Sequence, residues 1–511
     1  MKLKQWISVA VGCVFALSGA AACGPGEETP KIPVPDAVFS DLWTEGAEKE
    51  FALGETYTLE INEEIGANNY ILLDYESACG LDSTFYFAEQ GNPENGFEER
   101  FYLAPEDSEF RQIIDYYGEY LYDKTLSRIE FRCVGNAGGA FRLNKMEIAE
   151  HAVDFSLVDF QDPSALEENM QLFLQGSYVK LGITLKSGGA INWLSSINEN
   201  ISFSADLQNN GYVGDRARET VYLQDDVNLI NAHDTGRLVQ QSFYGTRGDS
   251  IAEPKDDYIC GYFDHDGNSA TPAVQWPYNP VQGGDRYENF SRLIDVQSTE
   301  NTIYIKSRPM DWAKNGSLTP FYMENTYRLL EDSVHGEYIE VDNRMIDFSG
   351  YVHDHKRDQE LPAFYGITPL GRLATYRGDR PWMEESYETI DNLGFWANAG
   401  KDNRFRATEN WIAWLNEDDW GVGLYVPDVE TMLVGRNAYS VDIGDIGVIP
   451  AQAGACTYTA PLGVFTMPNY EPFGYTYYLK LGYVNFTRDF FAQLHAAGAS
   501  NDNIVELEKR A

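Results

Sequence analysis

The chain has 511 residues, of which 43% are hydrophobic and 14% aromatic, so it carries enough apolar surface for a large core and disorder is excluded as its main state. Acidic residues outnumber basic ones by 79 to 38, and the net charge of −41 repels phosphate backbones and anionic lipids, which argues against a nucleic-acid partner. No apolar run beyond the N-terminus is long enough to cross a bilayer, which excludes a polytopic membrane protein.

Residues 1–22 predict a secretory signal, because two lysines precede an apolar stretch over residues 6–17 and small residues follow. The small residues lead into Cys23, which resembles the lipoprotein box of bacterial lipoproteins and implies a lipid on this cysteine. Cleavage near Ala22 by an ordinary signal peptidase is the alternative. Residues 23–37 are rich in Gly, Pro and Glu and predict a flexible tether. We therefore expect an exported protein held at the outer membrane, on its periplasmic or outer face, by the N-terminal lipid alone.

Export places Cys79, Cys133, Cys260 and Cys456 in an oxidising compartment, where three pairings are open. A bridge between Cys79 and Cys133 and a buried free thiol at Cys133 are equally favoured. No cysteine spacing indicates zinc, and no cofactor is expected. Residues 264–268, DHDGN, resemble the start of a calcium loop, but the distal glutamate is missing and a plain acidic turn is the favoured interpretation.

The fold class predicted from the remaining chain is all-β. Residues 38–150 read as short alternating strands and resemble the jelly-roll modules that flank many secreted carbohydrate-active enzymes; a spacer and a sugar-binding module are equally favoured. Residues 151–500 predict a large antiparallel β-sandwich, beginning with a hairpin whose first strand alternates at Val179, Leu181 and Ile183. A short C-terminal helix is expected to open at Thr487, and residues 501–511 form a charged tail expected to fray.

Four polar clusters lie between the predicted strands of the large sandwich, where loops on a rigid sheet often carry function. The first, in residues 228–245, offers an acid, a cation, an imidazole and amides that suit a sugar ring: His233, Asp234, Arg237, Gln241 and Tyr244. A turn in which Asp234 caps its neighbours and pairs with Arg237 would explain the same residues. The second, in residues 278–289, joins a Gly-Gly pair to Asn279, Gln282 and Asp285, although tight turns explain the same residues and are the favoured interpretation.

The third cluster, in residues 351–366, contains His353, His355, Glu360 and Tyr365. Two histidines in alternation could bind a metal on one strand face, but no third ligand is in register, so a hydrogen-bonded imidazole is favoured and no metal is assigned. The fourth, in residues 404–427, places Glu409 before Trp411 and Trp414. Seven of the ten tryptophans fall between positions 276 and 420, which suits stacking on sugar rings, and core packing accounts for some of them.

This layout resembles the secreted lipoproteins with which Bacteroidota process polysaccharides, in which a jelly-roll module precedes a large sandwich of the galactose-mutarotase or polysaccharide-lyase type. The segments that carry the resemblance are GGAINWLS, HDTGRLVQQSFYG, NPVQGGD, HDHKRDQELPAFYG and ENWIAWLNEDDWGVGLYVP. The resemblance implies a polysaccharide or oligosaccharide as the partner. It gives no residue a role, because no single catalytic family is matched.

Two classes of function follow from the side chains. A glycoside hydrolase would use Glu360 and Glu409 as paired carboxyl groups, with Asp234 and Asp285 as substitutes should either lie in a buried ion pair. A related lyase would use His233 or His353 with Tyr244 or Tyr365, and Arg237 would neutralise a uronate. A surface protein that binds glycans without turnover is the alternative class, and a mutarotase-like epimerase is a third hypothesis.

Overall fold

The computed structural model describes residues 48–65, 69–89, 92–113, 124–150, 171–197, 201–205, 219–223, 226–245, 261–263, 274–276, 279–350, 352–353, 356–384, 386–390, 393, 403–437 and 456–510. Cys23, Cys260, His355, the DHDGN segment and the predicted signal and tether lie outside these residues. Within the described part of the chain, no helix has the length and hydropathy needed to span a membrane. Nearly all regular elements are antiparallel strands, so the predicted all-β class is confirmed.

The N-terminal unit is a sandwich of two four-stranded sheets, ordered β1-β8-β3-β6 and β2-β7-β4-β5. This is the strand order of a jelly roll, which confirms the expected module. Phenylalanine and aliphatic side chains from both sheets fill its core. Its strands are β1 (Glu48–Phe51), β2 (Thr56–Ile65), β3 (Asn69–Ser77), β4 (Gly80–Glu89), β5 (Asn92–Leu103), β6 (Glu109–Ile113), β7 (Lys124–Val134) and β8 (Gly139–Glu150).

Two cysteines of this sandwich lie side by side. Cys79 follows β3 and Cys133 ends β7, and both are buried free thiols in the structure. Burial, reinforced by a hydrogen bond with Cys133, raises the pKa of the Cys79 thiol to about 12. The sequence left open a Cys79–Cys133 disulfide or a buried free thiol at Cys133. The structure has the two cysteines as neighbours in the thiol form.

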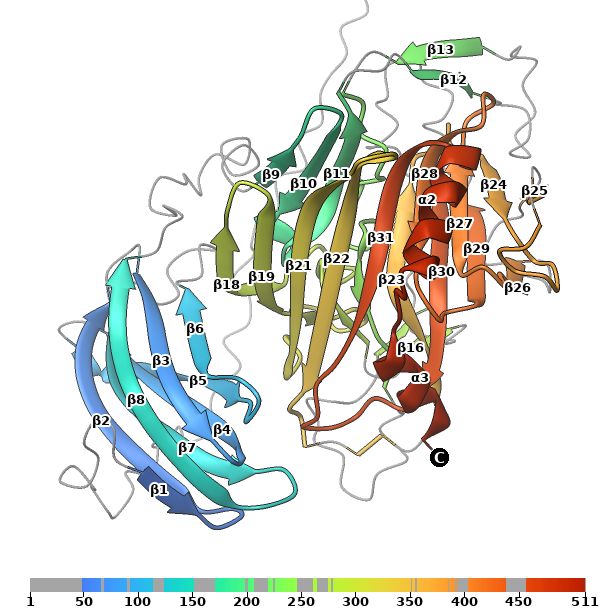
Figure 1. The fold of residues 1–511 in the computed structure, drawn as a ribbon. Helices are drawn as coiled ribbons and strands as arrows, with labels where there is room; N and C mark the ends of the chain where they lie inside the picture. The colour runs from blue at the N-terminus through green and yellow to red at the C-terminus, as the bar shows by residue number, and fades with distance from the viewer. Residues whose placement is uncertain are drawn as a thin grey trace, which may run out of the picture.

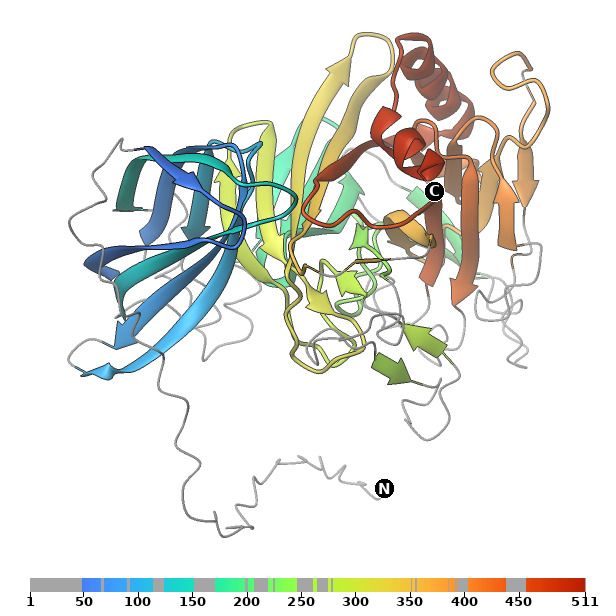
Figure 2. The same ribbon diagram turned by 90° about the horizontal axis from the view of Figure 1, so that it is seen from below.

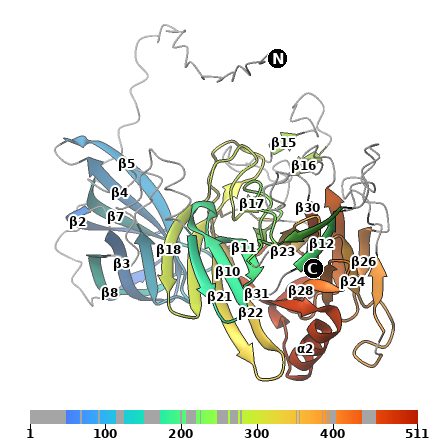
Figure 3. The ribbon, with the colours of Figure 1, turned by 90° about the horizontal axis from the view of Figure 1, so that it is seen from above.

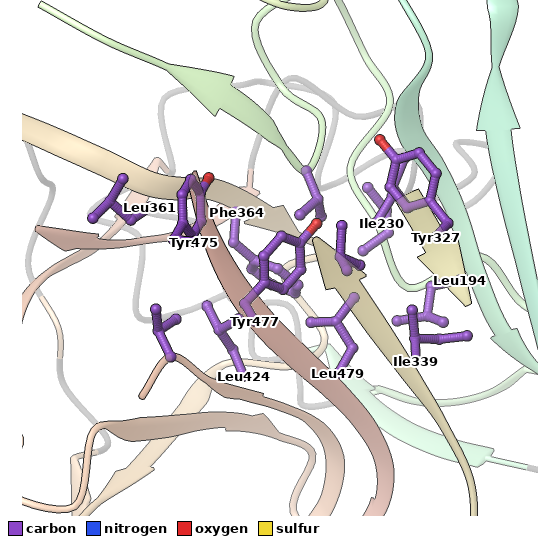
Figure 4. Packing of buried hydrophobic residues seen from close by; sticks show 14 of the residues in the cluster. Leu194, Ile230, Tyr327, Ile339, Leu361, Phe364, Leu424, Tyr475, Tyr477 and Leu479 are labelled. Carbon is purple, nitrogen blue, oxygen red and sulfur yellow. The ribbon is translucent and has the colours of Figure 1, made fainter. Parts of the chain in front are cut away.

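The large unit packs a nine-stranded sheet against a second layer, as Figure 1 shows. The nine-stranded sheet is ordered β18-β19-β21-β22-β31-β28-β27-β24-β25, and the facing layer holds a seven-stranded sheet, β20-β17-β14-β23-β30-β29-β26, and a three-stranded sheet, β11-β10-β9. Aliphatic and aromatic side chains of both layers interdigitate between them (Figure 4). This arrangement confirms the predicted large antiparallel sandwich.

The strands of the large unit are β9 (Gln171–Gln175), β10 (Val179–Thr184), β11 (Ala190–Ser196), β12 (Ile201–Ala205), β13 (Glu219–Leu223), β14 (Gln240–Ser242), β15 (Gly261–Phe263), β16 (Val274–Trp276), β17 (Pro280–Val281), β18 (Arg292–Ser298), β19 (Thr302–Arg308), β20 (Met310–Asp311), β21 (Phe321–Asp332), β22 (Gly336–Asp347), β23 (Arg357–Gly366), β24 (Arg372–Thr375), β25 (Glu388–Ile390), β26 (Arg404–Arg406), β27 (Trp411–Leu415), β28 (Trp420–Tyr425), β29 (Thr431–Asn437), β30 (Cys456–Phe465) and β31 (Phe473–Tyr483). A 3-10 turn, η2 (Leu185–Ser187), links β10 to β11. The predicted hairpin is therefore present, with Val179, Leu181 and Ile183 in the core.

The C-terminal helix begins earlier than expected. Helix α2 (Val484–Ala496) starts after Tyr483, and Thr487 is buried inside it instead of capping it. Its Phe490 and Phe491 pack on the nine-stranded sheet, which Figure 1 shows beneath the helix. A further helix, α3 (Asp502–Lys509), occupies most of the segment expected to fray. That expectation was wrong because two apolar side chains of the segment, at positions 504 and 507, enter the main core despite the charged residues around them.

The two units lie side by side (Figure 2), and an apolar cluster joins them where they meet. Tyr322 and Phe348 of the large unit belong to the apolar cluster of the N-terminal sandwich, and the Tyr322 hydroxyl accepts a hydrogen bond from the Tyr102 amide at 2.8 Å. Beside this contact, Glu99 accepts hydrogen bonds from Arg292 at 2.8 Å and from Arg308 at 3.2 Å. An apolar contact ringed by charge pairs favours one fixed arrangement of the two sandwiches.

Candidate functional site

Glu360 lies on the face of the seven-stranded sheet that points away from the main core. Strand β23 is irregular between Glu360 and Phe364, and the side chains of Leu361 and Phe364 fill the core. Tyr365 instead packs with Tyr458 of β30 in a separate small cluster on the opposite face. The irregularity therefore places one carboxyl group and a pair of tyrosines on the outer face.

The Glu360 carboxyl group is buried among hydroxyl groups. Tyr458 donates a short hydrogen bond to it, and Ser242 and Tyr244 also bond to it. Burial raises the pKa of Glu360, the charge of Asp358 adds to this effect, and the three hydroxyl bonds oppose it without cancelling it. Glu360 therefore keeps a proton at a higher pH than an ordinary glutamic acid, which is the property that a general acid needs.

Three tyrosines surround this carboxyl group. Burial and the negative charge of Glu360 raise the pKa values of Tyr244, Tyr365 and Tyr458 well above the usual value. The rings of Tyr365 and Tyr458 lie 4.8 Å apart, centroid to centroid. These phenols are therefore neutral near pH 7, so they can donate hydrogen bonds but do not serve as bases.

The loop that begins at His233 reaches the same face. Residues 226–231 run between β11 and β23, because the Leu229 amide bonds to the Leu194 carbonyl at 2.8 Å and the Asn231 amide to the Tyr365 carbonyl at 3.0 Å. The chain then turns at His233, whose side chain is exposed. This pairing explains how the loop that carries His233 comes next to β23, more than a hundred positions later in the chain.

Asp234 and Arg237 form the turn that the sequence analysis gave as the structural alternative to a binding site. Asp234 Oδ1 accepts the Gly236 amide at 3.0 Å, and Asp234 Oδ2 lies 3.3 Å from Arg237 Nε. Both side chains remain about a quarter exposed, at 24% and 23%. Their charges also act on Tyr365, because Asp234 raises its pKa and Arg237 lowers it. The loop is thus a well-formed turn that also lies in electrostatic reach of the Glu360 group.

Three groups near this loop were missed by the sequence analysis. The ring of Trp312 lies against Gly236, where an added Cβ would come within 2.4 Å of Trp312 Cη2. Burial and the charge of Asp234 raise the pKa of Glu288. Tyr458 could have been assigned to the outer face from its alternation with Ala460, but only the pairing of β23 with β30 shows that it meets Glu360.

Glu409 lies elsewhere, between the nine-stranded sheet and α2. Its side chain is fully buried and accepts four hydrogen bonds, from the Trp382 amide, the Trp411 indole and two nitrogens of Arg488, at 2.7 to 2.8 Å. Glu409 therefore lies in a buried ion pair with Arg488, the case in which Asp234 or Asp285 was expected to replace it as a catalytic carboxyl group. Every lone-pair direction of this carboxylate is used, so it is not available to a substrate.

The two predicted tryptophan platforms are interior. Trp411 and Trp414 are both 0% exposed, and they point to opposite faces of their sheet. The Trp411 indole bonds to Glu409, and the Trp414 indole donates to Thr459 Oγ1 at 2.8 Å. Core packing, the alternative noted from the sequence, therefore explains these two residues.

The predicted amides and Asp285 hold the scaffold together. Gln241 and Gln282 both donate to Asn325 Oδ1, at 3.1 and 2.8 Å, and Asn279 donates to the Phe243 carbonyl at 2.7 Å. All three are buried. Asp285 is fully buried and accepts hydrogen bonds from three loop amides and from an asparagine side chain. Asn279, Gln282 and Asp285 therefore bond within the protein, as the tight-turn explanation for the second cluster required, whereas the buried Gln241 Oε1 has no hydrogen-bond partner in the structure.

His353 is a buried partner of an aspartate. Its Nε2 lies 2.7 Å from Asp347 Oδ2, and the two side chains are 1% and 0% exposed. His355 is outside the described residues. Across the parts of the chain that the structure describes, no group of three potential ligands could hold a metal ion. The hydrogen-bonded imidazole favoured from the sequence is the arrangement found at His353.

No model of a known protein family matches the chain, and no curated protein sequence matches it significantly. Several solved structures are similar in architecture. An aldose epimerase homologue from C. elegans shares 8% identity at a TM-score of 0.32, covering 61% of this chain and 99% of that one. Galactose 1-epimerase from Lactobacillus acidophilus NCFM shares 9% identity at a TM-score of 0.30, covering 61% and 94%. A 4-alpha-glucanotransferase from Thermococcus litoralis shares 11% identity at a TM-score of 0.25, covering 61% and 39%. TM-scores this low support no conclusion about the activity of this chain.

Proposed function

We propose that this protein hydrolyses glycosidic bonds in an oligosaccharide or polysaccharide, with Glu360 as the general acid. The observation that carries the proposal is the Glu360 carboxyl group, buried among three hydroxyl groups with a raised pKa. A protonated carboxyl group can transfer its proton to the oxygen of the departing sugar. The surrounding tyrosine hydroxyls supply hydrogen bonds that suit the hydroxyl groups of a sugar.

Asp234 is the proposed second carboxylate. Glu409, the other carboxyl group favoured from the sequence, is fully engaged by Arg488 and two N–H groups between the nine-stranded sheet and α2. Asp234 is partly exposed and acts electrostatically on Tyr365, as Glu360 does. In this role Asp234 activates water or attacks the sugar carbon while Glu360 protonates the leaving oxygen.

The other classes of function receive less support. The lyase considered above pairs a histidine with a tyrosine; His353 is buried against Asp347, and the raised pKa values of Tyr244 and Tyr365 keep both phenols from acting as the base. A glycan-binding protein that stacks sugar rings on Trp411 and Trp414 is not supported, because both indoles are buried. Hydrolysis by Glu360 uses a carboxyl group and phenols that lie on the face of the sheet turned away from the main core.

The experiment that tests this proposal compares Glu360→Gln with the native protein on a panel of neutral polysaccharides, measuring released reducing sugar. General acid catalysis contributes about 10²- to 10⁴-fold, so we expect a loss of this size with an unchanged circular dichroism spectrum. Glu471→Gln, at a surface glutamate whose side chain is 53% exposed, is the matched control and should keep full activity. Equal turnover in Glu360→Gln and the control would refute the role of Glu360, and a product with the ultraviolet absorbance of an unsaturated uronate would indicate a lyase.

Export and lipid attachment belong to the same proposal. The predicted signal over residues 1–22 and the cysteine that follows support them. Labelled palmitate should enter the native protein and be lost in Cys23→Ser. Equal labelling of both would refute lipidation at this cysteine.

A further inference from the structure

A second group of aromatic side chains lies on the outer face of the three-stranded sheet. Gly182 of β10 pairs with Phe173 of β9 on one side and with Trp193 of β11 on the other. The neighbouring residues of β10 at positions 179, 181 and 183 fill the main core, so Phe173 and Trp193 point away from it. We call Phe173, Trp193 and Gly182 the aromatic patch.

Gly182 lets the Phe173 ring lie across the sheet. A Cβ at this position would come within 2.7 Å of Phe173 Cε1 and 2.6 Å of the Trp193 Cβ, so any other residue would push the rings apart. The ring centroids are 6.5 Å apart at an interplanar angle of 83°. Phe173 is 43% exposed, although an aromatic side chain of this kind is ordinarily buried. The patch therefore presents a partly exposed ring surface, with the Phe173 ring as its most exposed part.

Polar groups adjoin the rings. The Lys180 ammonium lies over one face of each ring, 4.8 Å from the Phe173 centroid and 5.2 Å from that of Trp193, and it pairs with Asp226 at 2.7 Å. Ser195 Oγ accepts the Trp193 indole at 2.8 Å and donates to Asp226 at 2.5 Å. A ring surface with amphipathic borders suits a pyranose ring, which has an apolar C–H face and hydroxyl groups at its edge.

The charge at the patch also bears on the ligand. Because Lys180 is paired with Asp226, the patch offers no net charge to attract an anionic polymer or a lipid surface. The strongly negative net charge of the chain disfavours both of those partners in any case. An uncharged saccharide fits the combination of ring surface and neutral polar border.

The patch and the Glu360 site lie on the same side of one continuous layer. Residues 226–231 pair with β11 and with β23, so the layer runs from β10 through β11 to β23 (Figure 3), and β9 extends it beyond β10. Two strand spacings, roughly 10 Å, separate β11 from β23. Residues 226–231 start at Asp226 beside the patch and pass the Tyr365 carbonyl before the turn at His233. Glu360 lies five residues before Tyr365 on β23, roughly 17 Å along the strand, so a chain of several sugar rings is needed to contact both places.

We propose that the aromatic patch is a remote binding site for the saccharide chain that is cleaved at Glu360. The proposal deepens the proposed function and rests on it, since it makes the substrate an extended neutral chain rather than a free monosaccharide. Rings several units from the cleaved bond stack on Phe173 and Trp193. Their binding energy then helps to place the bond at the carboxyl groups.

The test measures binding separately from turnover. In the Glu360→Gln background, Trp193→Ala and Phe173→Ala should each weaken binding of a long neutral oligosaccharide about tenfold by titration calorimetry, the size that loss of one aromatic contact produces. Trp193→Phe retains a ring and should retain most of the affinity. Phe486→Ala is the matched control, because Phe486 is also 43% exposed but lies on helix α2.

In the active protein, the same patch variants should raise KM for the long chain about tenfold and leave kcat/KM for a small aryl glycoside unchanged. Unaltered affinity in both alanine variants would overturn the proposal even if Glu360 proves catalytic. Conversely, weakened binding in both variants without hydrolysis of any substrate would support the patch and refute the proposed hydrolase. A loss of affinity equal to that of Phe486→Ala would also overturn the proposal, because it would show no specific role for the patch.

Discussion

Replacing Glu409 by alanine should destabilise the fold rather than remove a catalytic group. The change leaves the Arg488 guanidinium, whose side chain is only 11% exposed, without its counter-ion. Two further donors, the Trp382 amide and the Trp411 indole, lose their acceptor. Breaking a buried pair from one side costs about 3–5 kcal/mol, because the remaining charge stays buried and unpaired.

The assay is thermal and urea unfolding followed by circular dichroism, together with activity measured on the folded protein. At roughly 2 °C per kcal/mol for a large chain, the midpoint should fall by about 6–10 °C. Glu388→Ala is the control, since Glu388 is also paired with an arginine but its side chain is 49% exposed, and we expect a change within about 0.5 kcal/mol.

A double-mutant cycle completes the test. Glu409→Leu combined with Arg488→Met removes both charges, so the double variant should lose less stability than the sum of the two single variants. An alanine variant at 409 that keeps the native midpoint yet loses turnover would refute this reasoning. That result would indicate that Glu409 is a catalytic residue.

Three other predictions follow from the same contacts. Hydrolysis should decline as the pH rises through the raised pKa of Glu360. Tyr458→Phe should move this decline to higher pH, because the variant loses a hydrogen bond that lowers the pKa of Glu360. A shift to lower pH would contradict the assignment of Glu360 as the acid. Burial raises the pKa of Asp311 to about 7, so the folded state binds a proton that the unfolded state releases, and this contribution to stability is lost as pH rises from about 4 to 7. Asp311→Asn should therefore stabilise the protein at pH 8 relative to pH 5, by an amount of the order of 3 kcal/mol in urea unfolding, and equal effects at both pH values would contradict it. Deleting residues 1–150 should leave a large unit that binds a hydrophobic dye and aggregates, because Tyr322 and Phe348 lose their cover; a soluble fragment with native stability would contradict a shared core.

Strand faces were predictable because they depend on neighbours in the chain. The alternation at Val179, Leu181 and Ile183 places these residues in the core, and the structure agrees. The amphipathic stretch from Thr487 onward likewise predicted α2, although its start was missed by three residues because the residue before the helix is Tyr483, which forms no side-chain cap. Helix α3 was missed since its two core side chains are too few to give a clear period in a charged segment.

The sequence by itself determined that this chain is an all-β protein of two sandwiches, because the period of two and the turn residues are local properties. It also named both Glu360 and Glu409 as candidates, but it gave no reason to separate them. Only the tertiary structure did so, since the partners come from far along the chain: Tyr458 lies 98 positions from Glu360, and Arg488 lies 79 positions from Glu409. A buried carboxyl group beside neutral phenols keeps its proton to a higher pH, whereas one beside a guanidinium forms an ion pair. The packing of strands and helices determines which of these partners each glutamate meets.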